Sequence, residues 1–332
     1  MCDSIDQRQK PVKKVRFVDF DPSFVAEGCG LVKLLSQWYD IRIVKDPDYL
    51  IDGGLGYHHV KYDCIKIELN EENQVVDFNQ FDYGIGSDDL TFGDRYLRIP
   101  LYGTYGSYLS LYERKFPSDD ELLNRKFCSF VVSNGNGDPI RRKFFERLSK
   151  YKKVDSGGRW MNNVGGPVKD KLEFCRGYKF NIAFENSVSP GYTTEKLMQP
   201  LSVCSVPIYY GNASVDKDFR MESMIYVRDE DDVERAVEEV IRLDGDDVAY
   251  LSKVKEPCLV HPDRDHFVRM KANFLRHVFD QPLDKARRLN AYGYQAVQRK
   301  YTKPALRAHQ FLRDAFWGAQ ALLHGKIRHV VS

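Results

Sequence analysis

Charged and polar residues gather directly after an apolar run at residues 180–184. The segment FENS (residues 184–187) ends this run, and YTTEKL (residues 192–197) follows after a loop that contains Ser, Pro and Gly. The pattern predicts a buried strand, a loop, and a helix capped by Thr193 or Thr194. Free N–H groups and the positive end of the dipole make a helix start a binding site for anions, and Lys196 in the first turn adds a positive charge. We therefore predict an anion site here.

A similar series of strand, polar loop and helix lies at residues 127–150. The loop SNGNGD (residues 133–138) follows the apolar run, and the predicted helix carries Arg141 and Arg142 in its first turn. Its Gly-x-Gly pattern is not a complete dinucleotide fingerprint. Because open α/β sheets bind ligands outside the carboxyl ends of their strands, two such loops could hold a diphosphate between two cations. The alternative is that both arginines are solvated surface charges.

A candidate general base lies in the polar segment NEENQ (residues 70–74), between two strand-like runs. A carboxylate on a loop of one domain, facing an anion site in another, has the chemistry to accept a proton from a substrate hydroxyl. Glu72 is our candidate. The alternative is a solvated, glutamate-rich loop.

Metal chemistry is not predicted for this chain. The acidic clusters at residues 19–21, 229–231 and 244–247 are weak candidates, because the last two adjoin predicted helix ends, where Asp is expected as a cap. His58 and His59 are sequence neighbours that point apart on regular structure, and no third ligand is evident. Seven cysteines without paired short spacings indicate neither a disulfide framework nor a zinc site, and we expect Cys64, Cys128 and Cys204 to be buried thiols.

Composition excludes several classes of protein. The 332 residues include 50 basic and 48 acidic ones, a balance that does not favour general nucleic-acid binding. The first ten residues lack the apolar core of a signal peptide, and no segment of 18 apolar residues occurs. We therefore expect a cytoplasmic protein with at most peripheral membrane association.

Two series of alternating strands and helices predict two doubly wound α/β domains. The polar, Pro-containing stretch at residues 115–121 is the preferred boundary, which gives a first domain at 1–120, a second at 121–302 and a terminal helix at 303–332. Pro304 suits the first turn of that helix. An apolar stripe of Ala308, Leu312, Ala315, Ala319 and Leu322 predicts that the helix packs back on the first domain, with a dimer contact as the alternative.

The motifs quoted above, together with VPIYYG (residues 206–211), resemble in order and spacing the signature of the α-1,3/4-fucosyltransferases, glycosyltransferase family 10, and their bacterial soluble members in particular. FDYGIG (81–86), DRYLRIP (94–100) and FVVSN (130–134) extend the resemblance, which covers about residues 65–230. It implies a GT-B fold of two Rossmann-like domains facing across a cleft, with the acceptor on the first domain and GDP-fucose on the second.

The resemblance also implies roles for single residues. Arg141 and Lys196 would neutralise the diphosphate, and Glu72 would be the base of an inverting transfer. The family reads Gly-Glu-Asn where this chain has Glu71, Glu72 and Asn73, so either carboxylate could act. The other implied donor contacts are Ser133, Asn134, Asn186, Tyr192 and Glu195.

The expected activity is α-1,3 transfer of fucose to the GlcNAc of a β-galactosyl-GlcNAc acceptor, which gives a product of the Lewis X type. No cofactor is expected to be essential, and a divalent metal would at most stimulate. Two alternatives remain open. The first is a GT-B transferase that uses another nucleotide sugar or makes an α-1,4 linkage, and the second is a catalytically silent glycan-binding protein.

Overall fold

The computed structural model describes residues 10–104 and 106–323, without the side chains of residues 318–323. The chain divides into two compact units. Unit 1 consists of the described parts of Met1–Gly86, Leu90–Leu97 and Val268–Ser332, and unit 2 consists of Ser87–Asp89 and Arg98–Phe267. Both are α/β units built on a sheet, as predicted.

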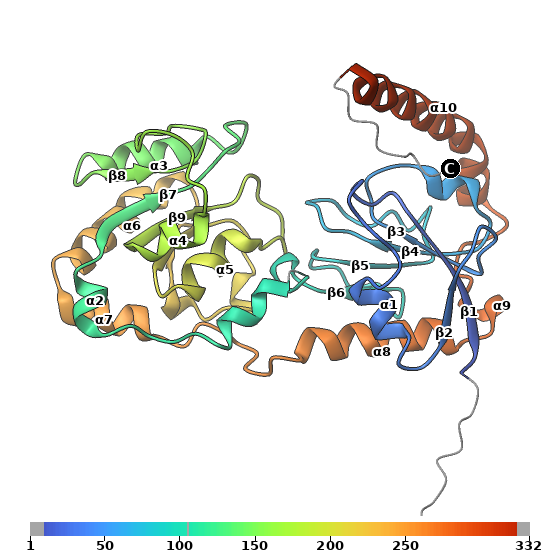
Figure 1. Ribbon diagram of the computed structural model, residues 1–332, viewed down its shortest axis with the longest axis horizontal. Helices are drawn as coiled ribbons and strands as arrows, with labels where there is room; N and C mark the ends of the chain where they lie inside the picture. The colour runs from blue at the N-terminus through green and yellow to red at the C-terminus, as the bar shows by residue number, and fades with distance from the viewer. Residues whose placement is uncertain (1–9, 105, 324–332) are drawn as a thin grey trace, which may run out of the picture. The chain divides into compact units, whose positions relative to one another are not determined.

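Unit 1 has a six-stranded sheet in the order β2-β1-β3-β4-β5-β6 (Figure 1). The pairings that join β2, β1, β3, β4 and β5 are all parallel. This order makes a doubly wound sheet whose topological switch point lies between β1 and β3. The strands are β1 (Val12–Val18), β2 (Asp40–Ile43), β3 (Tyr49–Asp52), β4 (Ile65–Leu69), β5 (Tyr83–Gly86) and β6 (Tyr96–Arg98).

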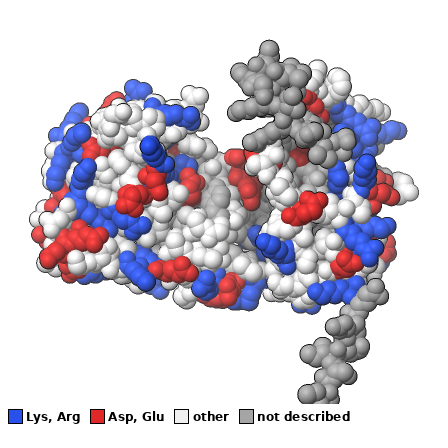
Figure 2. Space-filling view, in the orientation of Figure 1, with Lys and Arg blue, Asp and Glu red and all other residues white. Residues whose placement is uncertain are grey.

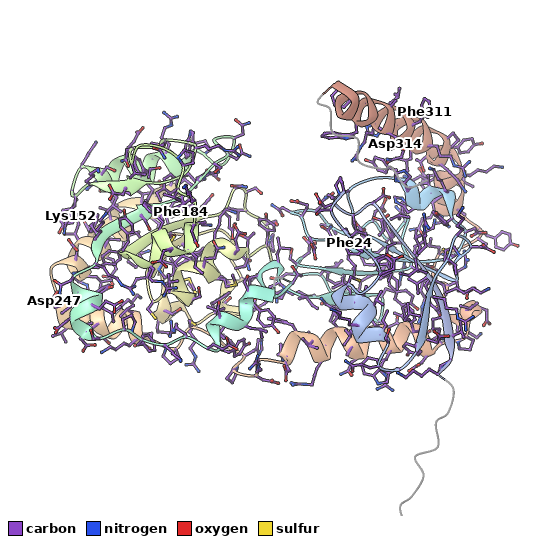
Figure 3. The ribbon with its side chains drawn as sticks, viewed as in Figure 1. Phe24, Lys152, Phe184, Asp247, Phe311 and Asp314 are labelled. Atoms are coloured by element: carbon purple, nitrogen blue, oxygen red, sulfur yellow. The ribbon has the colours of Figure 1, made fainter. Side chains whose placement is uncertain are left out.

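Unit 2 repeats this winding in a five-stranded sheet of order β11-β10-β9-β7-β8, with every pairing parallel. Its switch point lies between β7 and β9. All seven residues of the central strand β9 are buried, including Phe184 near its carboxyl end (Figure 3). The strands are β7 (Lys126–Phe130), β8 (Val154–Ser156), β9 (Tyr178–Phe184), β10 (Val206–Tyr210) and β11 (Ile225–Tyr226).

Helices flank both sheets. In unit 2, Phe144 and Leu148 of α3 and Val237 of α6 are buried at helical spacing and join the strands in one apolar core. The α-helices are α1 (Gly30–Leu35), α2 (Asp119–Leu123), α3 (Ile140–Ser149), α4 (Lys171–Arg176), α5 (Glu195–Ser202), α6 (Val233–Asp244), α7 (Asp247–Lys255), α8 (His266–Asp280), α9 (Leu283–Ala286) and α10 (Tyr294–Leu323). The 3-10 helices are η1 (His58–Lys61), η2 (Leu101–Gly103), η3 (Gly106–Leu111), η4 (Val215–Lys217), η5 (Met221–Ser223) and η6 (Glu230–Asp232).

The predicted domain limits differ from the observed units. Residues 115–121, the predicted boundary, lie inside unit 2, and the chain returns to unit 1 at Val268. The difference has a physical reason. Tyr102 and Tyr108 pack against Phe267 of α8, so the segment after β6 belongs to unit 2 although it follows a strand of unit 1.

The C-terminal helix begins ten residues before Pro304, at Tyr294, and the prediction of its buried face is wrong. Ala308 and Ala315 are exposed, and Leu312 is 66% exposed. Ala319 and Leu322 lie outside the described side chains. The helix instead contacts η1 through polar groups: Gln310 accepts a hydrogen bond from the N–H of Tyr57, and Asp314 lies 3.2 Å from His58 Nε2. Phe311, one residue after Gln310, is 72% exposed (Figure 3).

Cys64, Cys128 and Cys204 are buried, as predicted. Positive and negative side chains are interspersed over the face in Figure 2 rather than gathered in one basic field. No helix in the described ranges is both long enough and apolar enough to cross a membrane.

Candidate active site

The loop after β7 and the loop after β9 leave neighbouring strands at the switch point of unit 2. Phe130, the last residue of β7, pairs with Ile182 of β9, so both loops leave the same edge of the sheet. The first loop leads into α3 and the second into α5. The main-chain N–H of Asp138 in the first loop donates to the carbonyl of Asn186 in the second, at 3.0 Å. The sequence-predicted anion loops therefore form one continuous structure.

Arg141, in the first turn of α3, is fully buried and points back into this junction. Its Nη1 donates to Asn186 Oδ1 at 3.1 Å, and its Nη2 donates to the carbonyl of Asn134 at 2.8 Å. The guanidinium also lies 5.1 Å from the centre of the Trp160 ring. Its Nε has no hydrogen-bond partner among the described residues. A buried cation held in this way differs from a solvated helix charge such as its exposed neighbour Arg142.

The charge of Arg141 survives burial. Desolvation lowers the pKa of Arg141, and the nearby carboxylates of Asp138 and Glu185 act in the opposite sense. A guanidinium stays protonated at neutral pH in proteins, so Arg141 presents a positive charge. Gly137 is required for this placement, because a Cβ at that position would lie 1.8 Å from Arg141 Nη1.

Glu185 is a buried residue that holds the end of the second loop through hydrogen bonds. It follows β9 directly and is fully buried, and its carboxylate accepts hydrogen bonds from the N–H and Oγ1 of Thr194, at 2.9 and 2.8 Å. Lys196 Nζ lies 3.3 Å from the same carboxylate. Burial raises the pKa of Glu185, whereas Lys196 and Thr194 oppose the shift. Glu185 lies within the FENS motif, but the sequence alone predicts no role for it.

Thr194 is the N-cap of α5, as one of the two predicted alternatives required: its Oγ1 accepts from the N–H of Lys196 at 3.2 Å. Lys196 Nζ is also 3.7 Å from Glu195 Oε1, and its side chain remains 17% exposed. Burial alone would raise the pKa of Glu195, but the ammonium groups of Lys196 and Lys171 hold it below its ordinary value. The helix start thus carries a lysine whose ammonium lies within 4 Å of two carboxylates.

The remaining predicted donor residues surround this junction. Ser133 and Asn134 are exposed on the first loop, where Asn134 Oδ1 accepts from the N–H of Asn136. Tyr192 is 7% exposed on the second loop. These residues, with Arg141, Asn186, Glu195 and Lys196, come from the two loops and the helix starts that follow them.

Asn212 is a supporting residue that the sequence did not reveal. It begins a formal glycosylation sequon, but it is fully buried. Its Oδ1 accepts from the N–H of Gly191 at 2.8 Å, and its Nδ2 donates to Thr193 Oγ1 at 3.1 Å. Gly191 has a positive φ of 95°, and a Cβ there would lie 2.0 Å from the carbonyl oxygen of Ser87. The residues that flank Tyr192 are therefore fixed from both sides.

The candidate base lies in unit 1, on the loop after β4. Glu72 is exposed, and its N–H donates to Oδ1 of the buried Asn70 at 3.0 Å. Desolvation raises the pKa of the neighbouring Glu71, and the ammonium of Lys271 on α8 opposes the shift. Both carboxylates lie on the loop that leaves the carboxyl end of β4, the edge at which open α/β sheets bind ligands.

Two sequence profiles match the chain. The profile of the α-(1,3)-fucosyltransferase FucT N-terminal domain matches residues 15–105, and that of glycosyltransferase family 10 (fucosyltransferase), C-terminal part, matches residues 123–255. Together they cover more than half of the chain.

Relatives and solved structures agree with the profiles. The α-(1,3)-fucosyltransferase FucT of Helicobacter pylori is 35% identical over an alignment of 266 positions, and the match covers 67% of this chain and 55% of that protein. A fucosyltransferase-like protein of Acanthamoeba polyphaga mimivirus is 33% identical over 152 residues, 42% of this chain and 25% of that protein. The chain thus spans about half or less of the length of these relatives.

A crystal structure of an α1,3-fucosyltransferase with GDP-fucose superposes with a TM-score of 0.67 and 27% identity, over 85% of this chain and 94% of that one. A crystal structure of an α1,3-fucosyltransferase with GDP gives 0.66 and 28%, over 83% and 94%. The two doubly wound units are those of the predicted GT-B fold. From its two profile matches, its relatives and its fold, the chain belongs to glycosyltransferase family 10, the fucosyltransferases.

Proposed function

We propose that this protein transfers fucose from GDP-fucose to a hydroxyl of an acceptor glycan. The observation behind this proposal is the junction at the switch point of unit 2, where Arg141 donates to Asn186 and Lys196 Nζ lies 3.3 Å from the carboxylate of the adjacent residue Glu185. Two fixed cations and a helix N-terminus suit a diphosphate. The solved structures that resemble this chain were obtained with GDP-fucose and with GDP, which supports the same donor.

The proposed reaction is an inverting displacement. The acceptor hydroxyl oxygen attacks the anomeric carbon of β-linked GDP-fucose and passes its proton to the carboxylate of Glu72. The bond from the anomeric carbon to the diphosphate oxygen breaks, and GDP leaves with the electron pair. Arg141, Lys196 and the N–H groups at the start of α5 stabilise the negative charge that develops on the diphosphate.

No divalent metal is proposed at the donor. Glu185 and Glu195, the carboxylates at this junction, both lie within 4 Å of Lys196 Nζ, and the cations supply the positive charge that metals supply in other transferases. A stimulatory metal effect would have to act elsewhere.

We propose an α-1,3 linkage to the GlcNAc of a β-galactosyl-GlcNAc acceptor. The Helicobacter pylori relative and the matching crystal structures are α-1,3 enzymes by name. The opposing candidate is an α-1,4 linkage, since a bovine relative 32% identical over 140 residues is named as a 4-α-L-fucosyltransferase. The experiment is to supply GDP-fucose with Galβ1-4GlcNAc or with Galβ1-3GlcNAc, which leave different GlcNAc hydroxyls free, and to compare GDP release and the linkage of the product.

The assignment of the base is tested by two variants, each of which replaces one glutamate with the uncharged glutamine of the same size. Glu72→Gln should abolish transfer, because the acceptor proton then has no acceptor, while calorimetry should show GDP binding near that of the unmodified protein. Glu71→Gln is the matched control, and it should retain turnover. If Glu71→Gln is the inactive variant, the base moves by one residue; if both variants transfer fucose normally, the proposed mechanism is wrong.

Donor choice and enzyme function are tested on the unmodified protein. Calorimetry with GDP, UDP and ADP should show preferential binding of GDP, and a preference for UDP or ADP would identify a transferase for another nucleotide sugar. Binding of GDP without acceptor-dependent GDP release would instead indicate a catalytically silent glycan-binding protein.

A further inference from the structure

The switch point of unit 1 gathers charged groups of the opposite kind. Asp19 directly follows β1, Asp52 is the last residue of β3, and His59 lies in η1. Val18 pairs with Asp52 across β1 and β3, so the two carboxylates leave neighbouring strands at the same edge of the sheet. One atom from each of Asp19, Asp52 and His59 lies within 4.8 Å of the other two.

These three side chains are buried. Asp52 is 0% and His59 4% exposed, and the side chain of Asp19 is 2% exposed. His59 Nδ1 lies 3.3 Å from Asp52 Oδ2 and 4.0 Å from Asp19 Oδ2. Two ligands of one cation, bound at about 2.1 Å each, are roughly 3.0 to 3.4 Å apart. The 3.3 Å between His59 Nδ1 and Asp52 Oδ2 fits this range. The 4.0 Å between His59 Nδ1 and Asp19 Oδ2 would have to shorten slightly when an ion binds.

The cluster contains polar atoms without partners. His59 Nδ1 and Asp52 Oδ2 lie 3.3 Å apart without hydrogen-bond geometry, and Nε2 of His59 has no hydrogen-bond partner among the described residues. A buried polar atom left unpaired is costly, and native structures rarely keep one without a reason. Oδ1 of Asp52 accepts a hydrogen bond from the N–H of Gly54 at 2.7 Å. This bond fixes the orientation of the carboxylate and therefore of Oδ2.

A second group of contacts holds Asp19. His58 donates its main-chain N–H to Asp19 Oδ2 at 2.7 Å, and His58 Nδ1 lies 2.6 Å from Oδ1. Asp19 also adopts a positive φ of 58°, which is uncommon for a residue with a Cβ. A Cβ at Gly56 would lie 2.2 Å from Asp19 Oδ1, so this close approach requires glycine. Orienting contacts behind a first set of ligands are typical of metal sites.

Space for further ligands adjoins the cluster. Asp52 and His59 line a cavity of about 200 Å³ whose wall includes Glu68, Asp77 and Gln74. Glu68 pairs with Asp52 across β3 and β4 and contributes another buried carboxylate beside it. The cavity has room for water molecules to complete a coordination shell.

From these observations we infer that Asp19, Asp52 and His59 form a binding site for one divalent transition-metal ion in unit 1. One imidazole with two carboxylates suits Zn²⁺, Co²⁺ or Mn²⁺ better than the all-oxygen preference of Mg²⁺ or Ca²⁺. The site has a structural role at the switch point and is separate from the proposed fucosyl transfer. The sequence shows no ligand beside His59, because Asp52 and Asp19 lie 7 and 40 positions before it in the chain.

The test uses the 332-residue chain, freed of metal with a chelator and kept without nucleotide. Titration with Co²⁺ should produce visible absorption bands of bound cobalt that saturate at one equivalent per chain, and Zn²⁺ should displace them. Asp52→Asn and His59→Gln should each weaken Co²⁺ binding at least tenfold. Asp40→Asn, which removes an exposed carboxylate of β2 in the same unit, is the matched control and should bind like the unmodified protein.

Two results would overturn the inference. One is a titration of the unmodified protein that gives no saturable cobalt signal, which would identify the cluster as carboxylates that share a proton. The other is unchanged Co²⁺ affinity in folded Asp52→Asn and His59→Gln. If the variants do not fold, the titration and zinc displacement of the unmodified protein decide alone. Calorimetry with GDP separately reports on the donor site.

Discussion

The two switch points differ in charge although their topology is the same. In each unit the first strand of the series lies beside the third, and loops from these two strands meet at the carboxyl edge. In unit 2 the cations Arg141 and Lys196 lie beside the consecutive residues Asn186 and Glu185, whereas in unit 1 the carboxylates of Asp19 and Asp52 lie together. Topology therefore fixes where a ligand binds, and the side chains at that place fix whether the ligand is an anion or a cation.

The two sites also differ in how completely their polar groups are satisfied. Glu185 of unit 2 is bonded by Thr194 and Lys196, and Arg141 is bonded by Asn186 and Asn134. Among the described residues, only Nε of Arg141 lacks a hydrogen-bond partner in that guanidinium, whereas in unit 1 both ring nitrogens of His59 lack one. The unit 2 site is thus largely preorganised by the chain itself, while the inferred ion would complete the acidic site of unit 1.

The largest expected effect comes from removing the positive charges of unit 2. Arg141→Ala and Lys196→Ala should each lower kcat by about 100-fold to 1000-fold, because each loses a group that stabilises charge on the departing diphosphate. The measurement is turnover at saturating GDP-fucose.

Arg142→Ala is the control for both variants, since it removes an exposed arginine from the same helical turn and should keep normal turnover. Full turnover by Arg141→Ala or Lys196→Ala would contradict the assignment of the diphosphate site to this junction.

A pair of glycine substitutions compares the two switch points directly. Gly137→Ala places a methyl group against Arg141 Nη1, and Gly56→Ala places one against Asp19 Oδ1. A displacement of about 1 Å can cost up to about 100-fold in rate, so Gly137→Ala should lower kcat/KM by roughly 10-fold to 100-fold. Gly56→Ala should instead weaken Co²⁺ binding by roughly tenfold and leave GDP affinity unchanged.

Each glycine has a matched control within its own unit. A Cβ at Gly106 in unit 2 or at Gly30 in unit 1 meets nothing within 4 Å. Alanine at either position should therefore change neither kcat/KM nor Co²⁺ affinity. Loss of GDP affinity in Gly56→Ala would show that the two sites are coupled. Unchanged kinetics in Gly137→Ala would contradict the role given to the position of Arg141.

The smallest effect is a pH dependence of stability at Glu185. Burial raises the folded-state pKa of this carboxyl above the ordinary value of 4.5, so the folded protein retains a proton that the unfolded chain releases. Relative to Glu185→Gln, the unmodified protein should therefore lose stability as the pH rises above 4.5, by at most about 1.4 kcal/mol per pH unit.

Urea denaturation of both proteins between about pH 4 and 8 measures this difference. A difference that grows in favour of the unmodified protein over the same range would mean that Lys196 and Thr194 outweigh burial. The prediction would then have the wrong sign.

Much of unit 2 could be predicted from the sequence because its signals are local. The apolar run of β9, the cap at Thr194 and the first-turn cations Arg141 and Lys196 are each recognised from a few consecutive residues. Because parallel strands end at one edge, the two loops that lead to these helices were expected to meet, and Asp138 of the first loop does bond to Asn186 of the second. The domain limits failed because Tyr102 and Phe267, more than 160 residues apart, decide where the segment after β6 belongs.

The sequence by itself determined the family, the two doubly wound units and the two cationic loops, because hydrophobic periodicity and short motifs specify local structure. Only the tertiary structure decided that Glu185 lies beneath Lys196, that α10 packs through Gln310 rather than Leu312, and that Asp19, Asp52 and His59 meet. These contacts join residues from separate strands and helices, and their formation depends on how the elements pack. That packing cannot be predicted from any one segment of the chain alone.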